Sequence, residues 1–299
     1  MSISGIQSYS SAYGSTDNKA QIFSFPQQLH SNISPRSLLK NTLASNVLTT
    51  PVGPLQVWQN NIPSSGFDNP LATGQPIMLL IHGLGGEAKD MEPLVQALIP
   101  YFPKMSFVGV TLPEIAKPNG NSIQQHHFSQ QSIAQVRNTI DYLIEQPEHP
   151  PLYILAYSLG APITVQALSQ SQSKQNTAGL LLLAPAFDFS PTLNKSLYEQ
   201  DSSYANLLPY RHTQWQHNNE LRPIMRQSAD IIKQNFQTIP HHIFISQNDD
   251  AVSFSALQES LNEPSELTVL ANGSHDWMND PYLSELATQI AGWMNNPSM

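Results

Sequence analysis

Short apolar runs recur along the chain and are separated by longer segments with a different pattern. The runs are Ile77 to Ile81, Phe107 to Val110, Leu152 to Ala156, Leu180 to Leu183, Ile243 to Ile245 and Leu267 to Leu270. Runs of this length in which nearly every residue is apolar are typical of strands buried on both faces. The pattern therefore predicts a set of core strands.

The segments between the strands carry apolar residues at helical spacing. One set is Met91, Leu94, Val95, Leu98 and Ile99, and a second is Ile133, Val136, Ile140, Leu143 and Ile144. Each set occupies one face of a helix. Strands that alternate with helices predict an α/β fold with a mostly parallel central sheet and helices on both faces, because parallel strands need crossover connections.

The start of the chain has a different character. Residues 1–45 are rich in Ser, Gln and Asn, carry few charges and show no sustained period, so we expect a loosely ordered arm. From Val47 to Gln59, β-favouring residues lie on both sides of a Pro-Val-Gly-Pro segment, a pattern that predicts a hairpin at a sheet edge. The hairpin would open one folded domain over residues 46–299.

The alternation of strands and helices breaks at about residues 188–238. Apolar residues there, such as Leu207, Leu208 and Met225, are scattered among polar ones without a strand pattern. Two interpretations are open: a helical insertion that packs on the domain, or a cap that forms a substrate pocket. The position directly after a strand favours a short helical cap.

Composition excludes several classes of function. The formal net charge is −9 and only 12% of residues are charged, with no cluster of Lys and Arg that could bind a phosphate backbone. The chain has no cysteine, so it has no disulfide, thiolate nucleophile or thiolate metal site. We find no signal-peptide pattern and no apolar run of roughly 20 residues that could span a bilayer. We therefore expect a cytoplasmic protein that binds no nucleic acid.

Ser158 lies between a predicted strand and a predicted helix, in the segment LYILAYSLGAPITVQAL. Ala156 stands two residues before it and Gly160 two residues after it. A sharp strand-to-helix turn flanked by small residues exposes a serine hydroxyl for nucleophilic attack. The usual motif has glycine at both flanking positions, and a helix cap is the ordinary alternative role of such a serine.

A Gly-rich segment, HGLGG from His82 to Gly86, directly follows the first core strand. Such a turn can direct a backbone N–H toward the nucleophile. The backbone N–H groups of Leu84 and Leu159 are the candidates for an oxyanion hole. The segment lacks the spacing and the lysine of a nucleotide-binding loop, and His82 is interpreted as a structural partner of the turn.

A nucleophilic serine needs a histidine base and a carboxylate that orients the histidine. Both should follow Ser158 at the carboxyl ends of later strands, the acid before the histidine. The strand HHIFIS is followed by Asp249 and Asp250, and the strand ELTVLA is followed by His275. The residues alone thus indicate His275 as the base and leave Asp249 and Asp250 open as the acid.

These motifs, HGLGG, AYSLGA, SQNDDAV and NGSH, resemble those of the α/β-hydrolase superfamily, within it the carboxylesterase and monoacylglycerol-lipase type with a short cap. The resemblance covers roughly residues 47–297. It implies cleavage of a small-molecule ester or lipid without metal or organic cofactor. The acid of such esterases lies in a D-x-x-V pattern, which Asp249 and Val252 match. Two departures are Ala156 and the absence of a Gly-His-Gly turn.

Other functions of the same residues are weighed against ester hydrolysis. Acyl transfer or thioester cleavage would use the same triad, and a catalytically silent member would only bind a ligand, although it would not need all three residues. The pairs His126/His127 and His241/His242 do not predict a metal site, because neighbours in a strand point to opposite faces. The oligomeric state is not predicted.

Overall fold

The computed structural model describes residues 43–60, 71, 74–112, 130–188, 218–236, 238–252, 257–258 and 266–296, without the side chains of 218–222. The chain divides into two units, Met1–Leu38 and Leu39–Met299, and every described residue belongs to the second. The predicted N-terminal arm lies outside the described residues up to residue 42.

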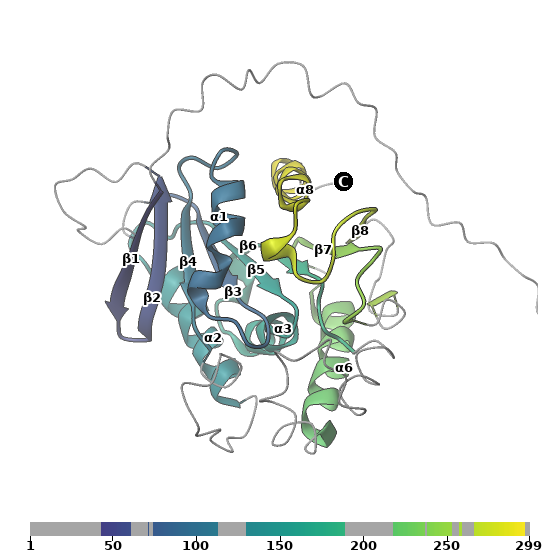
Figure 1. Ribbon diagram of the computed structural model, residues 1–299. Helices are drawn as coiled ribbons and strands as arrows, with labels where there is room; N and C mark the ends of the chain where they lie inside the picture. Colours follow the sequence, from purple (N-terminus) through teal and green to yellow (C-terminus); the bar gives the residue numbers. More distant parts are fainter. Residues whose placement is uncertain are drawn as a thin grey trace, which may run out of the picture. The chain divides into compact units, whose positions relative to one another are not determined.

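An eight-stranded sheet forms the centre of the described unit, in the order β1-β2-β4-β3-β5-β6-β7-β8 (Figure 1). β1 and β2 pair antiparallel, as do β2 and β4, and all other neighbours pair parallel. The mostly parallel sheet predicted from the apolar runs is confirmed. The strands are β1 (Leu43–Thr50), β2 (Gly53–Asn60), β3 (Ile77–Ile81), β4 (Ser106–Val110), β5 (Leu152–Tyr157), β6 (Thr177–Leu183), β7 (His241–Ser246) and β8 (Leu267–Leu270).

The predicted hairpin is the β1–β2 pair at one edge of the sheet. Its turn is closed by the Thr50 hydroxyl, which donates to the Gly53 carbonyl at 2.7 Å. Gly53 has a φ of 108°, a conformation that glycine adopts without steric cost. β1 begins at Leu43, so the strand includes Leu43–Ser45, which the sequence analysis assigned to the arm.

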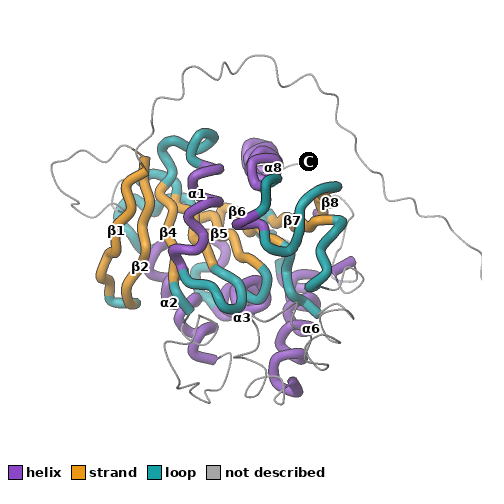
Figure 2. Tube along the Cα trace, viewed as in Figure 1, coloured by secondary structure: helices purple, strands orange, loops and turns teal. Residues whose placement is uncertain are grey.

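Helices cover both faces of the sheet (Figure 2). α1 and α8 contact each other on one face, while α3 contacts both α2 and α6 on the other. Short 3-10 turns lie at Ala88–Met91, Lys174–Asn176 and Trp277–Asn279. The α-helices are α1 (Glu92–Leu98), α2 (Gln130–Ile144), α3 (Gly160–Gln170), α6 (Asn218–Asn235) and α8 (Leu283–Asn295).

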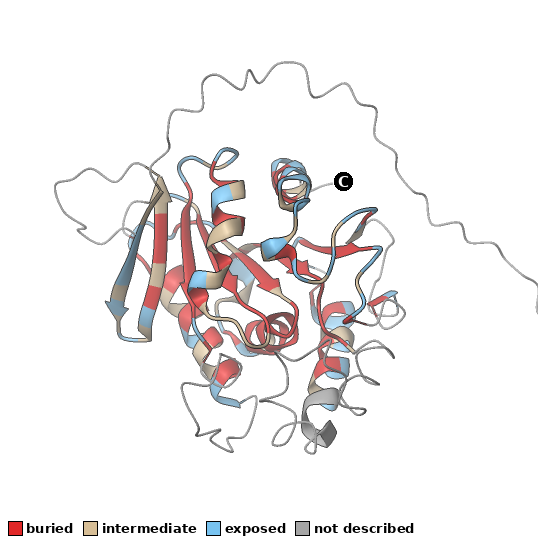
Figure 3. Cartoon of the chain, viewed as in Figure 1, coloured by how far each residue is buried: buried red, intermediate tan, exposed pale blue. Residues whose placement is uncertain are grey.

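The central strands are buried (Figure 3), and their side chains alternate between two apolar cores. In β3, Ile77, Leu79 and Ile81 pack with α2, α3 and α6, whereas Met78 and Leu80 pack with α1 and α8. Because the strand is buried on both faces, its sequence is apolar throughout rather than alternating. The helical faces predicted from spacing are buried in these cores, as expected.

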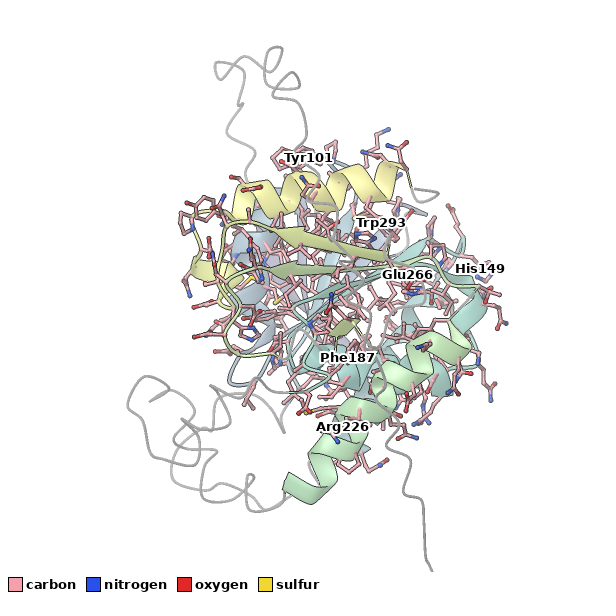
Figure 4. All side chains as sticks on the ribbon, turned by 90° about the vertical axis from the view of Figure 1, so that its right-hand side faces the viewer. Tyr101, His149, Phe187, Arg226, Glu266 and Trp293 are labelled. Atoms are coloured by element: carbon pink, nitrogen blue, oxygen red, sulfur yellow. The ribbon has the colours of Figure 1, made fainter. Side chains whose placement is uncertain are left out.

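α6 connects β6 to the parallel strand β7 and packs on α3. Met225 and Ile232 are fully buried, and the Ser228 hydroxyl lies 3.1 Å from the Pro162 carbonyl of α3. Arg226, on α6 in Figure 4, pairs with Asp188 at 2.8 Å between Nη2 and Oδ2. This part of the segment predicted as a cap is thus a crossover helix of the core.

The rest of the predicted cap, residues 189–217 with Leu207 and Leu208, lies outside the described residues. The cap over a substrate pocket therefore stays a prediction. Within the described ranges, no helix combines the length and the apolar character needed to cross a membrane.

Candidate active site

The candidate site lies where the carboxyl ends of two neighbouring parallel strands meet. β3 and β5 pair directly, with Ile81 opposite Ala156, so the Gly-rich turn after β3 and the serine turn after β5 emerge side by side. β4 lies on one side of β3 and β5 on the other. The crevice at such a reversal of strand order is where open α/β sheets bind ligands.

Ser158 occupies a strained backbone conformation in the turn between β5 and α3. Its φ is 52°, in the left-handed region that non-glycine residues rarely adopt. The Ser158 N–H donates to the Leu183 carbonyl at 2.9 Å, and its carbonyl accepts from the N–H groups of Ala161 and Ala186, each at 3.1 Å. Such strain persists only where the surroundings enforce it, and it concentrates at functional sites.

Small residues around Ser158 permit this sharp turn. A Cβ on Gly160 would lie 2.4 Å from the His82 carbonyl oxygen and 2.9 Å from Ile81 Cγ2, so only glycine fits without movement of the backbone. Ala156 replaces the first glycine of the usual motif. Ala156 is fully buried and pairs with Ile81 and Leu182 in the sheet, so β5 keeps its pairing with alanine at this position.

Three predicted side chains from different strand ends form one hydrogen-bonded chain. Ser158 Oγ lies 2.9 Å from His275 Nε2, and His275 Nδ1 lies 2.9 Å from Asp249 Oδ2. A carboxylate only accepts, so His275 Nδ1 carries the proton and Nε2 presents its lone pair to the serine hydroxyl. Asp249 contacts the imidazole, whereas the neighbouring Asp250 is exposed to solvent.

Asp249 is held by its own backbone turn. Its side chain is only 1% exposed, and Oδ1 accepts the N–H groups of Ala251 at 3.0 Å and Val252 at 3.1 Å. One carboxylate oxygen thus binds the backbone and the other faces His275. The turn follows β7 directly, because Asp249 N–H donates to the Ser246 carbonyl at 3.2 Å.

The loop that carries His275 follows β8 and is tied to the fold at several points. The His275 carbonyl accepts the Tyr157 hydroxyl at 2.7 Å and the Trp277 N–H at 3.0 Å. The Ser274 N–H donates to Asp280 Oδ2 at 2.7 Å. Gly273 has a φ of 102°, and a Cβ there would lie 2.7 Å from the Trp277 ring, so the loop requires glycine at this position.

The Gly-rich turn is closed by the Gly86 N–H, which donates to the Gly83 carbonyl at 3.2 Å, with Gly85 at a φ of 74°. A Cβ on Gly83 would lie 3.0 Å from Ser158 Cβ, so the backbone of the turn runs next to the nucleophile. Among the described residues, the N–H groups of Leu84 and Leu159 have no hydrogen-bond acceptor. Both N–H groups stay candidates for the predicted oxyanion hole.

His82 supports this turn and is not available as a base. The Leu112 N–H donates to His82 Nε2 at 2.9 Å, so the ring proton is on Nδ1, which lies 2.8 Å from the Gly83 carbonyl. Burial lowers the pKa of His82 and favours the neutral ring that both hydrogen bonds need. The predicted structural role of His82 is consistent with this geometry.

Metal ligands do not gather in the described part of the chain. No group of three or more His, Asp or Glu residues there could hold an ion. His242 Nε2 lies 2.8 Å from Thr268 Oγ1, and His241 Nε2 lies 3.5 Å from Glu266 Oε1, so the two neighbours have separate partners. His126 and His127 lie outside the described residues.

Tyr157 is a residue of the site that sequence reasoning missed. The sequence shows only an aromatic residue next to the serine. Its hydrogen-bond partner is the backbone carbonyl of His275, 118 positions away. Every residue has such a carbonyl, so no residue type in the sequence could indicate this contact.

A model of the protein family described as alpha/beta hydrolase of unknown function matches residues 73–289. The chain belongs to this α/β-hydrolase family. The match begins just before β3 and includes β3 to β8, so it spans every strand end that carries a candidate residue. No curated protein matches the sequence of this hydrolase.

Solved structures with the same fold include several hydrolases. The monoglyceride lipase of Saccharomyces cerevisiae has a TM-score of 0.56 at 12% identity, with 89% of this chain and 99% of that chain covered. An esterase of Pyrococcus furiosus has a TM-score of 0.53 at 14% identity, with 89% and 94% covered. A thioesterase domain from the curacin biosynthetic pathway has a TM-score of 0.53 at 13% identity, with 86% and 100% covered. At such identities the likeness shows the fold.

Proposed function

We propose that this α/β hydrolase is a serine esterase that cleaves carboxylic esters, small or lipid-like, through an acyl-enzyme. Ser158 is the nucleophile, His275 the general base and Asp249 the acid that orients the base. The observation that carries the proposal is the continuous hydrogen-bonded chain from Ser158 Oγ through the imidazole to Asp249, with both contacts at 2.9 Å. Nucleophile, base and orienting group in this arrangement are the signature of covalent acyl transfer.

In the acylation step, His275 Nε2 removes the proton of the Ser158 hydroxyl while Oγ attacks the ester carbonyl carbon. The imidazolium that forms is stabilised by Asp249. The tetrahedral intermediate then collapses, the bond to the alcohol oxygen breaks, and His275 gives its proton to the leaving alcohol. Water, deprotonated by His275, attacks the acyl-enzyme in the second step and releases the carboxylic acid with Ser158 restored.

The negative oxygen of the tetrahedral intermediate would bind to the N–H groups of Leu84 and Leu159. Both groups lack another acceptor among the described residues, and the Gly83 backbone runs beside Ser158. Donors of this kind act where charge develops only in the transition state, and removal of one such donor typically costs about 100- to 1,000-fold in rate.

Two further observations support an ester or thioester as substrate. Proteins with the same fold include an esterase, a monoglyceride lipase and a thioesterase domain. A serine at the nucleophile position is also what acyl transfer needs. Enzymes of this fold that remove halogens or hydrolyse epoxides have a carboxylate at that position instead. Thioester cleavage and transfer to an added alcohol would follow the same steps with another leaving group or acceptor.

A fluorophosphonate probe tests the proposal, because an activated serine attacks phosphorus as it attacks a carbonyl carbon. We expect stoichiometric labelling of the wild-type protein, with the modified peptide containing Ser158. Ser158→Ala should abolish both labelling and the hydrolysis of p-nitrophenyl butyrate. Ser284→Ala is a matched control, because Ser284 is an exposed serine on α8.

Labelling that persists in Ser158→Ala, or hydrolysis that survives in it, would remove Ser158 as the nucleophile. Chain-length profiling with p-nitrophenyl acetate, butyrate and octanoate then identifies the acyl group that is preferred. Parallel assays with an acyl thioester and with added methanol separate hydrolysis of oxygen esters from thioesterase or transferase activity.

A further inference from the structure

Tyr157 lies next to three parts of the candidate catalytic site: the nucleophile turn, the Gly-rich turn and the loop of His275. It is the last residue of β5 and precedes Ser158 directly, so its backbone is part of the nucleophile turn. Its hydroxyl donates to the His275 carbonyl at 2.7 Å. Its ring lies beside the Gly-rich turn, since a Cβ on Gly83 would come within 3.2 Å of two ring atoms.

The contact with His275 acts on the backbone of the base. The imidazole reaches Ser158 and Asp249 through two rotatable bonds, so its position depends on where the His275 main chain is held. The carbonyl that Tyr157 binds also accepts the Trp277 N–H at 3.0 Å, which fills both acceptor positions of that oxygen. The ring centroids of Tyr157 and His275 lie 5.4 Å apart with an interplanar angle of 35°, so Tyr157 also packs against the imidazole.

The Tyr157 hydroxyl stays protonated and so remains a hydrogen-bond donor. Burial raises the pKa of Tyr157 far above its usual value, with Asp276 and Asp249 adding to the effect. The phenol therefore keeps its proton at every pH at which an esterase is assayed. A carbonyl cannot donate, so the direction of the hydrogen bond is unambiguous.

We propose that Tyr157 is a positioning residue whose hydroxyl holds the main chain of His275 so that the imidazole stays aligned between Ser158 and Asp249. The inference rests on the proposed esterase function. Through this contact, a strand residue with no chemical step of its own couples the nucleophile turn to a loop 118 positions away. Loss of the hydroxyl should loosen the alignment of the base without removing any reacting atom.

Tyr157→Phe tests this inference because it removes the hydroxyl and retains the ring. We expect kcat for p-nitrophenyl butyrate to fall about twofold to tenfold, the range set by one neutral hydrogen bond. KM should stay unchanged, since Tyr157 is not proposed to bind the substrate. The rate constant of fluorophosphonate labelling should fall by a similar factor, because it reports activation of Ser158 by His275.

Tyr153→Phe is the matched control. Tyr153 lies on the same strand and packs partly buried against the same core, and the substitution removes the same atom. It should leave kcat and the labelling rate unchanged. Rates are normalised to the titre of labelled sites, so that a variant with lower stability is compared per folded molecule, and the melting temperature of each variant is measured alongside.

The outcomes separate the two proposals. If Ser158→Ala is inactive and Tyr157→Phe has the kcat and labelling rate of the wild type, the positioning role is wrong and the esterase mechanism stands. A lower melting temperature with unchanged normalised kcat would assign Tyr157 to packing alone and also overturn the inference. If Ser158→Ala retains hydrolysis, the proposed function fails, and the positioning role fails with it.

Discussion

Replacing Asp249 by asparagine tests the least obvious member of the proposed triad. Asparagine has nearly the same shape as aspartate, so the variant should fold. The decisive feature is that the two carboxylate oxygens of Asp249 have different partners. Oδ1 accepts the N–H groups of Ala251 and Val252, and Oδ2 lies 2.9 Å from His275 Nδ1.

These partners determine how the amide must sit. With its oxygen in the Oδ1 place, the amide keeps both backbone hydrogen bonds and turns its NH₂ group toward His275. The opposite orientation would set NH₂ against two N–H groups in a site where the side chain is 1% exposed, and each unsatisfied donor would cost about 1–3 kcal/mol. The imidazole must then accept at Nδ1 and carry its proton on Nε2, where the proton points at Ser158 Oγ.

A base that carries its proton on Nε2 cannot take another from serine. In a Ser-His-Asp triad this exchange lowers kcat by a factor on the order of 10⁴. That factor corresponds to about 5 kcal/mol of activation free energy. KM should change little, because Asp249 contacts His275 and the backbone rather than the substrate.

The assay compares kcat and KM of wild-type protein, Asp249→Asn and Asp250→Asn on p-nitrophenyl butyrate, with far-UV circular dichroism as the measure of folding. Asp250→Asn makes the same chemical change at the neighbouring exposed residue, and its kcat should stay within about tenfold of the wild type. A large loss of kcat confined to Asp250→Asn would show that Asp250, and not Asp249, orients His275. Little loss in either variant would remove both from the triad.

Two predictions concern stability. Burial, with His241 adding to it, lowers the pKa of His242 from 6.5 to about 4. Between these two values only the unfolded chain binds the proton, so the free energy of unfolding falls as the pH falls from 6.5 to about 4. The total loss is about 3 kcal/mol. His242→Gln should flatten this part of the pH profile of urea unfolding, whereas substitution of the exposed His149 by asparagine should not; equal slopes in all three proteins would contradict the assignment. Gly160→Ala should lower the free energy of unfolding by about 1–3 kcal/mol, because the new Cβ meets the His82 carbonyl oxygen at 2.4 Å. Gly292→Ala on α8, where the added Cβ meets nothing, should raise it by up to about 1 kcal/mol. Similar urea midpoints for both variants would refute the argument.

Much of the fold could be predicted because burial leaves a local mark on the sequence. The run Ile77 to Ile81 is the strand β3 with the same bounds, and all of its residues are buried. A strand buried on both faces must be apolar at every position, and a helix covering a sheet must be apolar at every third or fourth. Each pattern lies within one element, so the sequence alone indicates it.

The residues brought together at the site were also predictable, for a topological reason. Parallel strands joined by crossover helices all end at the same edge of the sheet, so polar residues directly after β5, β7 and β8 are near each other in space. Ser158, Asp249 and His275 each follow such a strand. The choice between Asp249 and Asp250 needed a resemblance as well, because the residues alone left both open.

Only the tertiary structure shows the contacts in which a side chain meets a backbone group far along the chain. The Tyr157 hydroxyl on the His275 carbonyl and the Leu112 N–H on His82 are of this kind. α6 is another case, because its Met225 and Ile232 are buried against α3 in a segment without a clear sequence pattern. Backbone groups are the same at every residue, and long-range packing depends on the whole chain. The local sequence therefore determines where the helices and strands lie, and only the folded structure decides which contacts join them.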